Sequence, residues 1–369
     1  MIPTIDLFAG AGGIGIGVCA AGGRLLLSME IDKLCCETLS LNHEKHPGKI
    51  LNGDVDDITG QELRECAGLS HNDPLVIVGG PPCQPFSKAS YWTDPGDDSR
   101  YRQARMQGVE IAKPSPITKA KKDERRDLVD SFLNRVIESN ADGFLFENVT
   151  SILHPRNKKI VDRFLAKAKR HGYKCTLVKA NAAEYGVPQI RQRVFILATK
   201  AKQPIIPSLT HFDPAKMVNG NDKLLPYTTA GSAISYFSDD MFFEPEEVVV
   251  GKWANELKQI PPGMNYKALS AWAGHPNPVF IAETRFWNFL LKLSPDKPSW
   301  TIAATPGPWT GPFHWDNRRL RTVEMAVLQT FPADYNFAGN RRERVKQIGN
   351  AAPPQLVKCM LEAVYKAIE

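Results

Sequence analysis

The stretch LVIVGGPPCQPFS, residues 75–87, decides the fold and carries the chain's most distinctive chemical group, the thiol of Cys83. Residues 75–78 form a short apolar run, which is typical of a buried strand. Two glycines and two prolines follow, and proline fixes φ, so Cys83 is held on a stiff turn at the strand's carboxyl end. Ligands bind at that edge in open α/β sheets. Cys83 is therefore a candidate nucleophile, although a buried structural cysteine is the alternative, because reactivity requires a lowered thiol pKa.

Strand-like and helix-like segments alternate on both sides of this stretch. The strands are expected at residues 4–8, 25–29, 75–78, 143–146 and 194–198. The helices are expected up to about residue 21 and over residues 32–41, 127–138 and 157–171. Alternation of this kind predicts an α/β fold in which a parallel sheet carries helices on both faces.

The rhythm is lost from about residue 201 to 316, where Pro, Gly and aromatic residues are scattered without a period. We interpret this part as a second, smaller and irregular domain, whose six tryptophans are more typical of a core than of a binding surface. An amphipathic helix is expected at the end of residues 345–368. The predicted division is residues 1–200, 201–340 and 341–369.

Bulk composition is that of an ordinary globular protein. The chain has 369 residues, 43% of them apolar and 23% charged, and a formal net charge of +6. This mild basic excess permits a polyanionic partner without requiring one. Seven cysteines without a CxxC pair indicate reduced thiols in a cytosolic protein rather than disulfides or a metal site. Neither a signal peptide nor a membrane-spanning run is expected.

A glycine-rich turn joins the first strand to its helix. It reads DLFAGAGG over residues 6–13, and glycines let a backbone approach a ligand closely beside the free N–H groups of a helix N-terminus. Glu30 ends the second strand about 20 residues later, where an acid can bind ribose hydroxyls. No Gly-Lys-Ser/Thr follows, which excludes a P-loop. Asp54 could contact an adenine amino group, but a turn aspartate is an equal alternative.

Two further motifs supply charged groups at the same sheet edge. Glu147 follows the strand at residues 143–146, so its carboxyl emerges beside Cys83. A thiol and a carboxyl in one pocket indicate covalent catalysis with a proton donor, whereas a helix-capping acid is the alternative. Arg191 and Arg193 alternate at the entry to a strand, so both point to one face, where paired arginines bind carboxylates or a polar substrate. A solvated strand edge is the other interpretation.

These motifs, in this order, resemble the cytosine-5 DNA methyltransferase family of bacterial restriction-modification systems. The likeness continues through RLRTVE (residues 319–324), LQTFP (328–332) and QIGNAAPP (347–354). It covers the whole chain except the loop after Ser87 and residues 201–316.

The resemblance implies S-adenosylmethionine as cofactor on a Rossmann-like methyltransferase sheet. It would place Phe8 near the adenine, Glu30 on the ribose and Asp54 on the adenine. The other positions carried over to the cofactor site are Asp6, Gly10, Gly12, Gly13, Ile31, Val55, Pro81 and Asn350. Asn350 also matches a residue that ties the C-terminal helix to the catalytic domain. No metal is implied.

The implied reaction is methylation of carbon 5 of a cytosine flipped out of double-stranded DNA. The Cys83 thiolate would attack C6, Glu147 would bind or protonate N3, and Arg193 would contact O2. Arg191, counted with the catalytic group, looks like a structural partner. Residues 201–340 would form the target recognition domain. A monomer in the bacterial cytoplasm, at the nucleoid and with a possible cognate restriction endonuclease, is expected.

Three alternatives compete with this assignment. The tRNA-methylating branch of the family is disfavoured because its Cys-Phe-Thr segment is absent. A non-catalytic DNA-binding homologue is disfavoured by the intact Cys83, Glu147 and Arg193. A nicotinamide dehydrogenase would leave the Pro-Pro-Cys motif unexplained.

The chain also departs from the family pattern in three places. Arg126 stands where glycine is common, Thr330 replaces a glycine, and the loop at residues 88–126 is long and basic. The first and third put the closing geometry of that loop in question, and they leave the chemistry unaffected.

Overall fold

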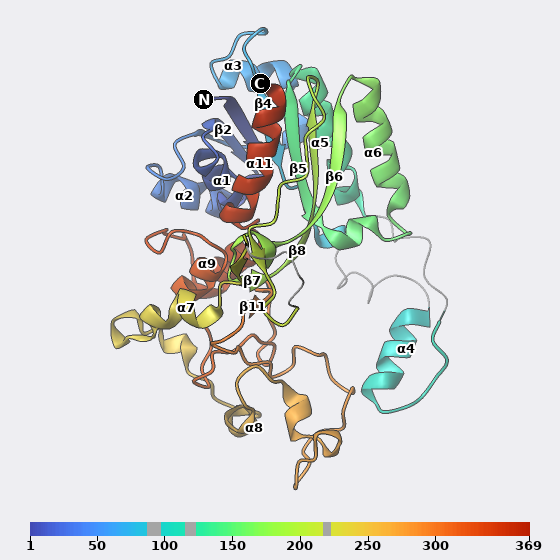
Figure 1. The fold of residues 1–369 in the computed structure, drawn as a ribbon, viewed down its shortest axis with the longest axis vertical. Helices are drawn as coiled ribbons and strands as arrows, with labels where there is room; N and C mark the ends of the chain where they lie inside the picture. Colours follow the sequence, from blue (N-terminus) through green and yellow to red (C-terminus); the bar gives the residue numbers. More distant parts are fainter. Residues whose placement is uncertain (87–96, 115–122, 217–222) are drawn as a thin grey trace.

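The structure, a computed structural model, describes residues 1–86, 97–114, 123–216 and 223–369. Its centre is a seven-stranded sheet of order β3-β2-β1-β4-β5-β8-β6 (Figure 1). The strands are β1 (Pro3–Leu7), β2 (Arg24–Glu30), β3 (Lys49–Asn52), β4 (Val76–Gly79), β5 (Gly143–Val149), β6 (Lys174–Asn181) and β8 (Gln192–Thr199). Every strand that the sequence predicts is therefore present, and the α/β fold is confirmed.

Helices cover both faces of the sheet, as the alternation predicts (Figure 1). The helices of the sheet domain are α1 (Gly13–Ala20), α2 (Lys33–Leu41), α3 (Gly60–Cys66), α5 (Leu128–Glu138), α6 (Lys158–Arg170) and α11 (Pro354–Ile368). Side chains alternate across β5, where Phe144 and Phe146 pack with α5 and α6 while Leu145 packs with α1 and α11. No helix in the described part of the chain is long and apolar enough to cross a membrane.

The sheet is not parallel throughout, which corrects the prediction of an all-parallel sheet. The strands from β3 to β5 pair in parallel, but β8 runs antiparallel to both β5 and β6. The reason lies in the connections, since a parallel neighbour needs a long crossover. Helix α6 provides one from β5 to β6, whereas β6 returns to β8 through residues 182–191 alone, with no α-helix between them.

The region from residue 201 onward is irregular, as expected. Its regular elements are short: β9 (His211–Phe212), β10 (Leu225–Pro226), α7 (Ala230–Ile234), α8 (Ala254–Gln259) and β11 (Ser299–Trp300). It has a core of its own, made by Leu257, Ile260, Tyr266, Leu269, Phe280, Leu290 and Phe313. Strand β11 pairs with β7 (Gln189–Ile190), and this pairing fastens the region to the segment that enters β8.

The tryptophans of this region divide into two groups. Trp253, Trp309 and Trp315 pack against hydrophobic cores, as the sequence predicts. Trp272, Trp287 and Trp300 are exposed by 78%, 53% and 36%. The expectation that these aromatic residues form core is therefore correct for only part of the set.

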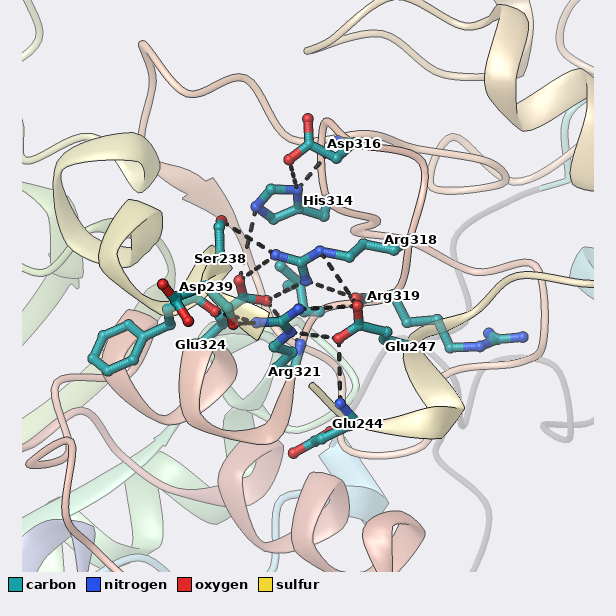
Figure 2. Close-up of polar contacts among 12 residues, drawn as sticks. Ser238, Asp239, Glu244, Glu247, His314, Asp316, Arg318, Arg319, Arg321 and Glu324 are labelled. Atoms are coloured by element: carbon teal, nitrogen blue, oxygen red, sulfur yellow. Dashed lines mark hydrogen bonds and ion pairs between the residues drawn. The ribbon is translucent and has the colours of Figure 1, made fainter. Parts of the chain in front are cut away.

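A buried ionic network joins the irregular region, residues 201–316, to the start of α9 (Thr322–Leu328), as Figure 2 shows. Arg321 donates to both carboxylate oxygens of Glu247, and Arg318 holds Glu324 through bonds of 2.6 and 2.8 Å. His314 lies fully buried beside them, and burial lowers its pKa to about 3. Each buried charge is thus matched by an opposite charge, so the motif at residues 319–324 is structural here.

The tail forms two helices where the sequence predicts one. Helix α10 (Arg341–Asn350) ends before α11 begins, because the proline pair at residues 353–354 cannot continue a helix. Helix α11 packs on α1, which brings the two ends of the chain together (Figure 1).

Candidate active site

The turn that carries Cys83 is held in place by its neighbours. Phe86 donates its backbone N–H to the carbonyl of Cys83 at 2.9 Å and closes the turn. The side chain of Asn148, which is buried on β5, donates to the carbonyl of Pro81 at 3.0 Å. Both bonds fix backbone on either side of the thiol, so the turn is rigid, as its prolines predict.

Glu147 and Arg193 form a buried ion pair next to this turn. Arg193 Nε lies 2.8 Å from Glu147 Oε1, and each residue is only 9% exposed. The antiparallel register of β5 and β8 sets Arg193 opposite Val149, two residues beyond Glu147 on the same face. Burial raises the pKa of Glu147, while the charges of Arg193 and Arg191 oppose that rise. A carboxyl in these surroundings can hold a proton closer to neutral pH than an exposed glutamate does.

Gly80 makes room for this carboxyl. A Cβ atom placed at Gly80 would lie 2.9 Å from Glu147 Oε2, so any side chain there would displace the carboxyl. Gly80 therefore allows the backbone of the turn to lie close to the Glu147 carboxyl. The only sign of this role in the sequence is the position of the glycine before the Pro-Pro-Cys turn.

The surroundings of Cys83 favour the protonated thiol over the thiolate. Burial raises its pKa, and the charge of Glu147 adds to the rise, whereas Arg193 and Arg191 lower it. Generating the thiolate therefore requires a change in surroundings, such as an incoming substrate that takes up the charge of the carboxyl.

Arg191 does not face the cavity. Its fully buried guanidinium donates to the backbone carbonyls of Ile302, Gly349 and Ala351 at 3.2, 2.7 and 3.0 Å. These contacts agree with the prediction that Arg191 is a structural partner, because its donors hold the end of α10 beside the start of β8. A direct part of Arg191 in catalysis stays a prediction. The resemblance predicts that Asn350 connects the C-terminal helix to the catalytic domain. In the structure Arg191 makes this connection, and the side chain of Asn350 is exposed.

A cavity of about 400 Å³ extends from Cys83 to the glycine-rich turn. The predicted cofactor residues that line it are Phe8, Gly10, Gly13, Glu30, Ile31, Pro81 and Asn350, and Cys83 and Glu147 line it as well. Glu30 is fixed by the backbone N–H groups of Gly10 and Asp32, each 2.8 Å from one of its oxygens. The structure thus brings the nucleophile candidate and most of the cofactor candidates into one space.

Four predicted cofactor residues lie outside this lining. Asp6 is fully buried, and burial together with the charge of Glu30 raises its pKa well above the usual range. Gly12 has φ +89°, and a side chain there would meet the hydroxyl of Tyr335. Val55 belongs to the hydrophobic core, and Asp54 lines an adjoining hollow and caps a short 3₁₀ turn. Gly12 thus acts by shaping the turn, and contacts of Asp6 with the cofactor and of Asp54 with an adenine stay predictions.

One wall of the cavity was missed in the sequence. Glu343, Lys346 and Gln347 of α10 line it together with Asn350. Their spacing is i, i+3, i+4 and i+7, which places all four on one face of a helix. The periodicity was therefore available as a signal once residues 341–350 were recognised as a helix.

The basic loop after the active-site turn is described only in part. The structure places α4 (Asp97–Met106) within it (Figure 1). Arg105 forms an ion pair of 2.8 Å with Glu283, which belongs to the irregular region after residue 200. Arg100 is exposed, whereas the side chain of Arg102 and residues 119, 121 and 122 lie outside the described residues. An exposed pair of this kind contributes about 0–1 kcal/mol, so it holds α4 weakly.

Metal ligands are not grouped in the described part of the chain: no three His, Cys, Asp or Glu side chains there come together as a metal site requires.

Comparison with known proteins defines the family of this chain. Residues 2–366 match the family described as C-5 cytosine-specific DNA methylase. The type II methyltransferase M.SacI of Streptomyces achromogenes is 34% identical over 100% of this chain and 93% of its own length. M.NgoFVII of Neisseria gonorrhoeae is 29% identical over 95% of this chain and 83% of its own.

Two solved structures share the fold. A DNA modification methyltransferase encoded within an E. coli prophage superposes with a TM-score of 0.64 at 21% identity, covering 99% of both chains. The methyltransferase EhMeth of Entamoeba histolytica gives 0.58 at 12% identity, covering 100% of this chain and 99% of its own. The chain belongs to the C-5 cytosine-specific DNA methylase family. It is a DNA methyltransferase that acts on carbon 5 of cytosine and takes the methyl group from S-adenosylmethionine.

Proposed function

We propose that this enzyme methylates cytosine in a specific sequence of double-stranded DNA through a covalent bond to Cys83, as the modification half of a restriction-modification system. The observation that carries the assignment of residues is the single cavity that Cys83 and Glu147 share with Glu30 and the glycine-rich turn. A nucleophile and a cofactor-binding edge in one space allow the methyl donor and the base to meet.

The chemistry begins with carbon 5 of cytosine, which is a poor nucleophile. Cys83 Sγ forms a bond to C6, and Glu147 delivers a proton to N3 as electron density moves into the ring toward C5. Arg193, which already holds the Glu147 carboxylate at 2.8 Å, orients it and contacts the O2 of the base. Carbon 5 then takes the methyl group, and S-adenosylhomocysteine is left as the second product. Solvent water takes the proton of C5 as the Cys83–C6 bond breaks, and N3 returns its proton to Glu147, so the aromatic ring, the thiolate and the carboxyl group are all restored.

The residues present fit S-adenosylmethionine, which supplies an electrophilic methyl group when bound. The Glu30 carboxylate is oriented by two backbone N–H groups and suits the ribose hydroxyls. Phe8 stands on the same wall and suits the adenine face, with Asp54 beyond it for the adenine edge. Lys346 and Glu343, which also line the cavity, provide charges for the amino-acid portion.

Residues 201–340 are proposed as the target recognition domain, 1–200 as the catalytic domain and 341–369 as the returning C-terminal part. The exposed Trp272, Trp287 and Trp300 support this role, because exposed aromatic faces suit a nucleic acid better than solvent. A cation, Lys267 Nζ, also lies 5.7 Å from the ring centre of Trp272. Trp300 lies on β11, directly against the segment that leads to Arg193. The exposed arginines of α4 would contact phosphates, which position the protein without reading bases.

The chain is proposed to act as a monomer at the bacterial nucleoid, with a cognate endonuclease that cleaves unmodified copies of the same site. The relatives support this setting, since both named above are type II methyltransferases.

The test is transfer of tritiated methyl groups from S-adenosylmethionine to duplex DNA and, in parallel, to tRNA. Label should enter DNA alone, and bisulfite sequencing of the product should locate every modified cytosine in one short sequence. Label in tRNA alone would support the RNA-methylating alternative. Label in neither, with bound S-adenosylhomocysteine and DNA, would support the non-catalytic homologue.

A further inference from the structure

Arg126 is a buried arginine that touches two segments around the active site. It is 9% exposed and precedes α5 in a short 3₁₀ turn (Glu124–Arg126). Its Nη2 donates to the carbonyl of Pro85 at 2.6 Å, and its guanidinium lies 5.1 Å from the ring centre of Phe86. Its Nη1 donates to Asn157 Oδ1, also at 2.6 Å. One side chain thus connects the Cys83 turn with the segment after Glu147.

The Asn157 contact extends to the strand that bears Glu147. Asn157 is fully buried, and its amide donates to the carbonyl of Ser151 at 2.8 Å. Ser151 belongs to the 3₁₀ turn (Thr150–Leu153) that follows β5 directly. Arg126 therefore links two backbone carbonyl groups. It bonds directly to the carbonyl of Pro85, two residues after Cys83, and through Asn157 it is connected to the carbonyl of Ser151, four residues after Glu147.

The Cys83 turn is consequently held from both of its ends. Asn148 fixes the carbonyl of Pro81 before the thiol, and Arg126 fixes the carbonyl of Pro85 after it. The first bond comes from the main sheet, whereas the second depends on one side chain from the start of α5. Cutting the second would remove a bond that fixes the backbone two residues after the thiol.

We propose that Arg126 is a positioning residue for the Cys83 nucleophile, an inference that rests on the proposed function of Cys83. Attack on C6 requires the sulfur and the carbon to meet within about 3–3.5 Å along a defined direction, and a misplacement of about 1 Å can lower a rate about 10²-fold. The bridge through Asn157 keeps the thiol and the carboxyl of Glu147 at a fixed separation while the base enters between them.

The arrangement requires a guanidinium in particular. Two nitrogens of the planar fork donate to acceptors on different segments while its face stacks on Phe86. A lysine ammonium can reach one acceptor but cannot bridge both and stack. Lysine should therefore restore only part of the function, which distinguishes a geometric role from a simple requirement for positive charge.

The experiment compares Arg126→Met, Arg126→Lys and Asn157→Ala with wild type. The control is Arg163→Met. Arg163 is an exposed arginine of α6 that pairs with Asp130 of α5. Two quantities are measured: the single-turnover rate of methyl transfer to duplex DNA, and the dissociation constants for DNA and S-adenosylhomocysteine. Thermal unfolding of each variant checks that it folds.

The expected result is a 10- to 100-fold lower rate for Arg126→Met, a smaller loss for Arg126→Lys and Asn157→Ala, and dissociation constants within threefold of wild type. Arg163→Met should match wild type. A rate within twofold of wild type for Arg126→Met overturns the inference, and so does a loss of DNA affinity equal to the loss of rate. If Arg126→Met does not fold, the other two variants decide by the same criteria. If wild type transfers no methyl group, the proposed function fails and this inference falls with it.

Discussion

Replacing Glu147 with glutamine removes the group that exchanges a proton for a negative charge, while preserving the shape of the side chain. Glutamine fits the space beside Gly80 because it has the same heavy-atom skeleton, and its carbonyl can still accept from Arg193. The contact of 2.8 Å with Arg193 stops being an ion pair, and the guanidinium keeps its charge without a counter-charge. The cost is at most that of breaking a buried ion pair, about 3–5 kcal/mol, because the glutamine carbonyl still accepts from Arg193. The variant no longer buries a negative charge, and the desolvation energy saved offsets part of this loss of stability, so the variant should fold.

The chemical step should also become much slower. Loss of a proton-transfer group lowers rates by about 10²–10⁴, which corresponds to about 2.7–5.5 kcal/mol of barrier. The assay is single-turnover transfer of methyl groups to duplex DNA, with binding of S-adenosylhomocysteine and DNA measured separately. Both affinities should remain within threefold of wild type. A variant that loses cofactor affinity but keeps its rate would refute the assignment of Glu147 as the proton donor.

The pH dependence gives a second readout of the same substitution. Because burial raises the pKa of Glu147, its protonated form persists to higher pH than in an exposed glutamate and declines as pH rises further. The thiolate of Cys83 grows with rising pH, so wild type should show a bell-shaped profile whose two limbs belong to the coupled pair. Glutamine cannot deprotonate, so the alkaline decline should vanish. The remaining rise should also move to lower pH, since the Glu147 charge that raises the pKa of Cys83 is gone. An unchanged bell would contradict the account.

Three further predictions concern the cofactor edge, the carboxyl pocket and the buried histidines. Glu30→Ala should weaken S-adenosylhomocysteine binding at least tenfold in a calorimetric titration while leaving DNA affinity unchanged, and equal affinity would exclude the ribose role. Gly80→Ala places a Cβ 2.9 Å from the Glu147 carboxyl and should slow methyl transfer at least tenfold, so a wild-type rate would show that the carboxyl can move. Burial lowers the pKa of His46 and His314 to about 4 and about 3. Between these values and the usual histidine pKa, the unfolded chain therefore binds protons at both histidines and the folded chain does not. The free energy of unfolding should therefore be unaffected above about pH 6.5 and fall below it, by at most about 1.4 kcal/mol per pH unit for each histidine, and a flat denaturant-unfolding series from pH 6.5 to 5 would contradict this.

The strands of the sheet were predictable because most of them are buried on both faces. Residues 75–78 and 143–146 are continuous apolar runs, and such runs identify central strands without reference to any partner. Strand β6 was missed because it lies at the sheet edge and mixes Lys174 and Lys179 with apolar residues. The reversed direction of β8 was missed for a different reason, since periodicity reports which side chains are buried and not which way a strand runs.

The candidate site was predictable to the extent that its residues follow strands. Glu30, Cys83 and Glu147 each stand at a strand's carboxyl end, and parallel strands bring those ends to one edge. The partners of these groups could not be predicted, because they depend on register and packing. The Glu147–Arg193 pair requires the register of β5 against β8, and the contacts of Arg191 require the end of α10, 158 residues away, to lie against β8.

Arg126 is another residue whose contacts the sequence does not show. In the sequence it is a departure that puts the geometry of the loop in question. In the structure it is a bond donor to the Cys83 turn, and only the fold shows that the space around Phe86 accepts a guanidinium.

The central claim, that Cys83 forms a covalent bond to the base, is tested most directly with duplex DNA in which the target cytosine carries fluorine at carbon 5. The fluorine cannot leave as the proton does, so the reaction should stop with the base attached to the enzyme. In the presence of S-adenosylmethionine, wild type should give a complex whose mass equals enzyme, DNA and one methyl group, and peptide mapping should place the attachment on Cys83. Cys83→Ser should give none while binding S-adenosylhomocysteine within twofold of wild type. An attachment on any other residue, or a complex formed by Cys83→Ser at the wild-type rate, would contradict the account.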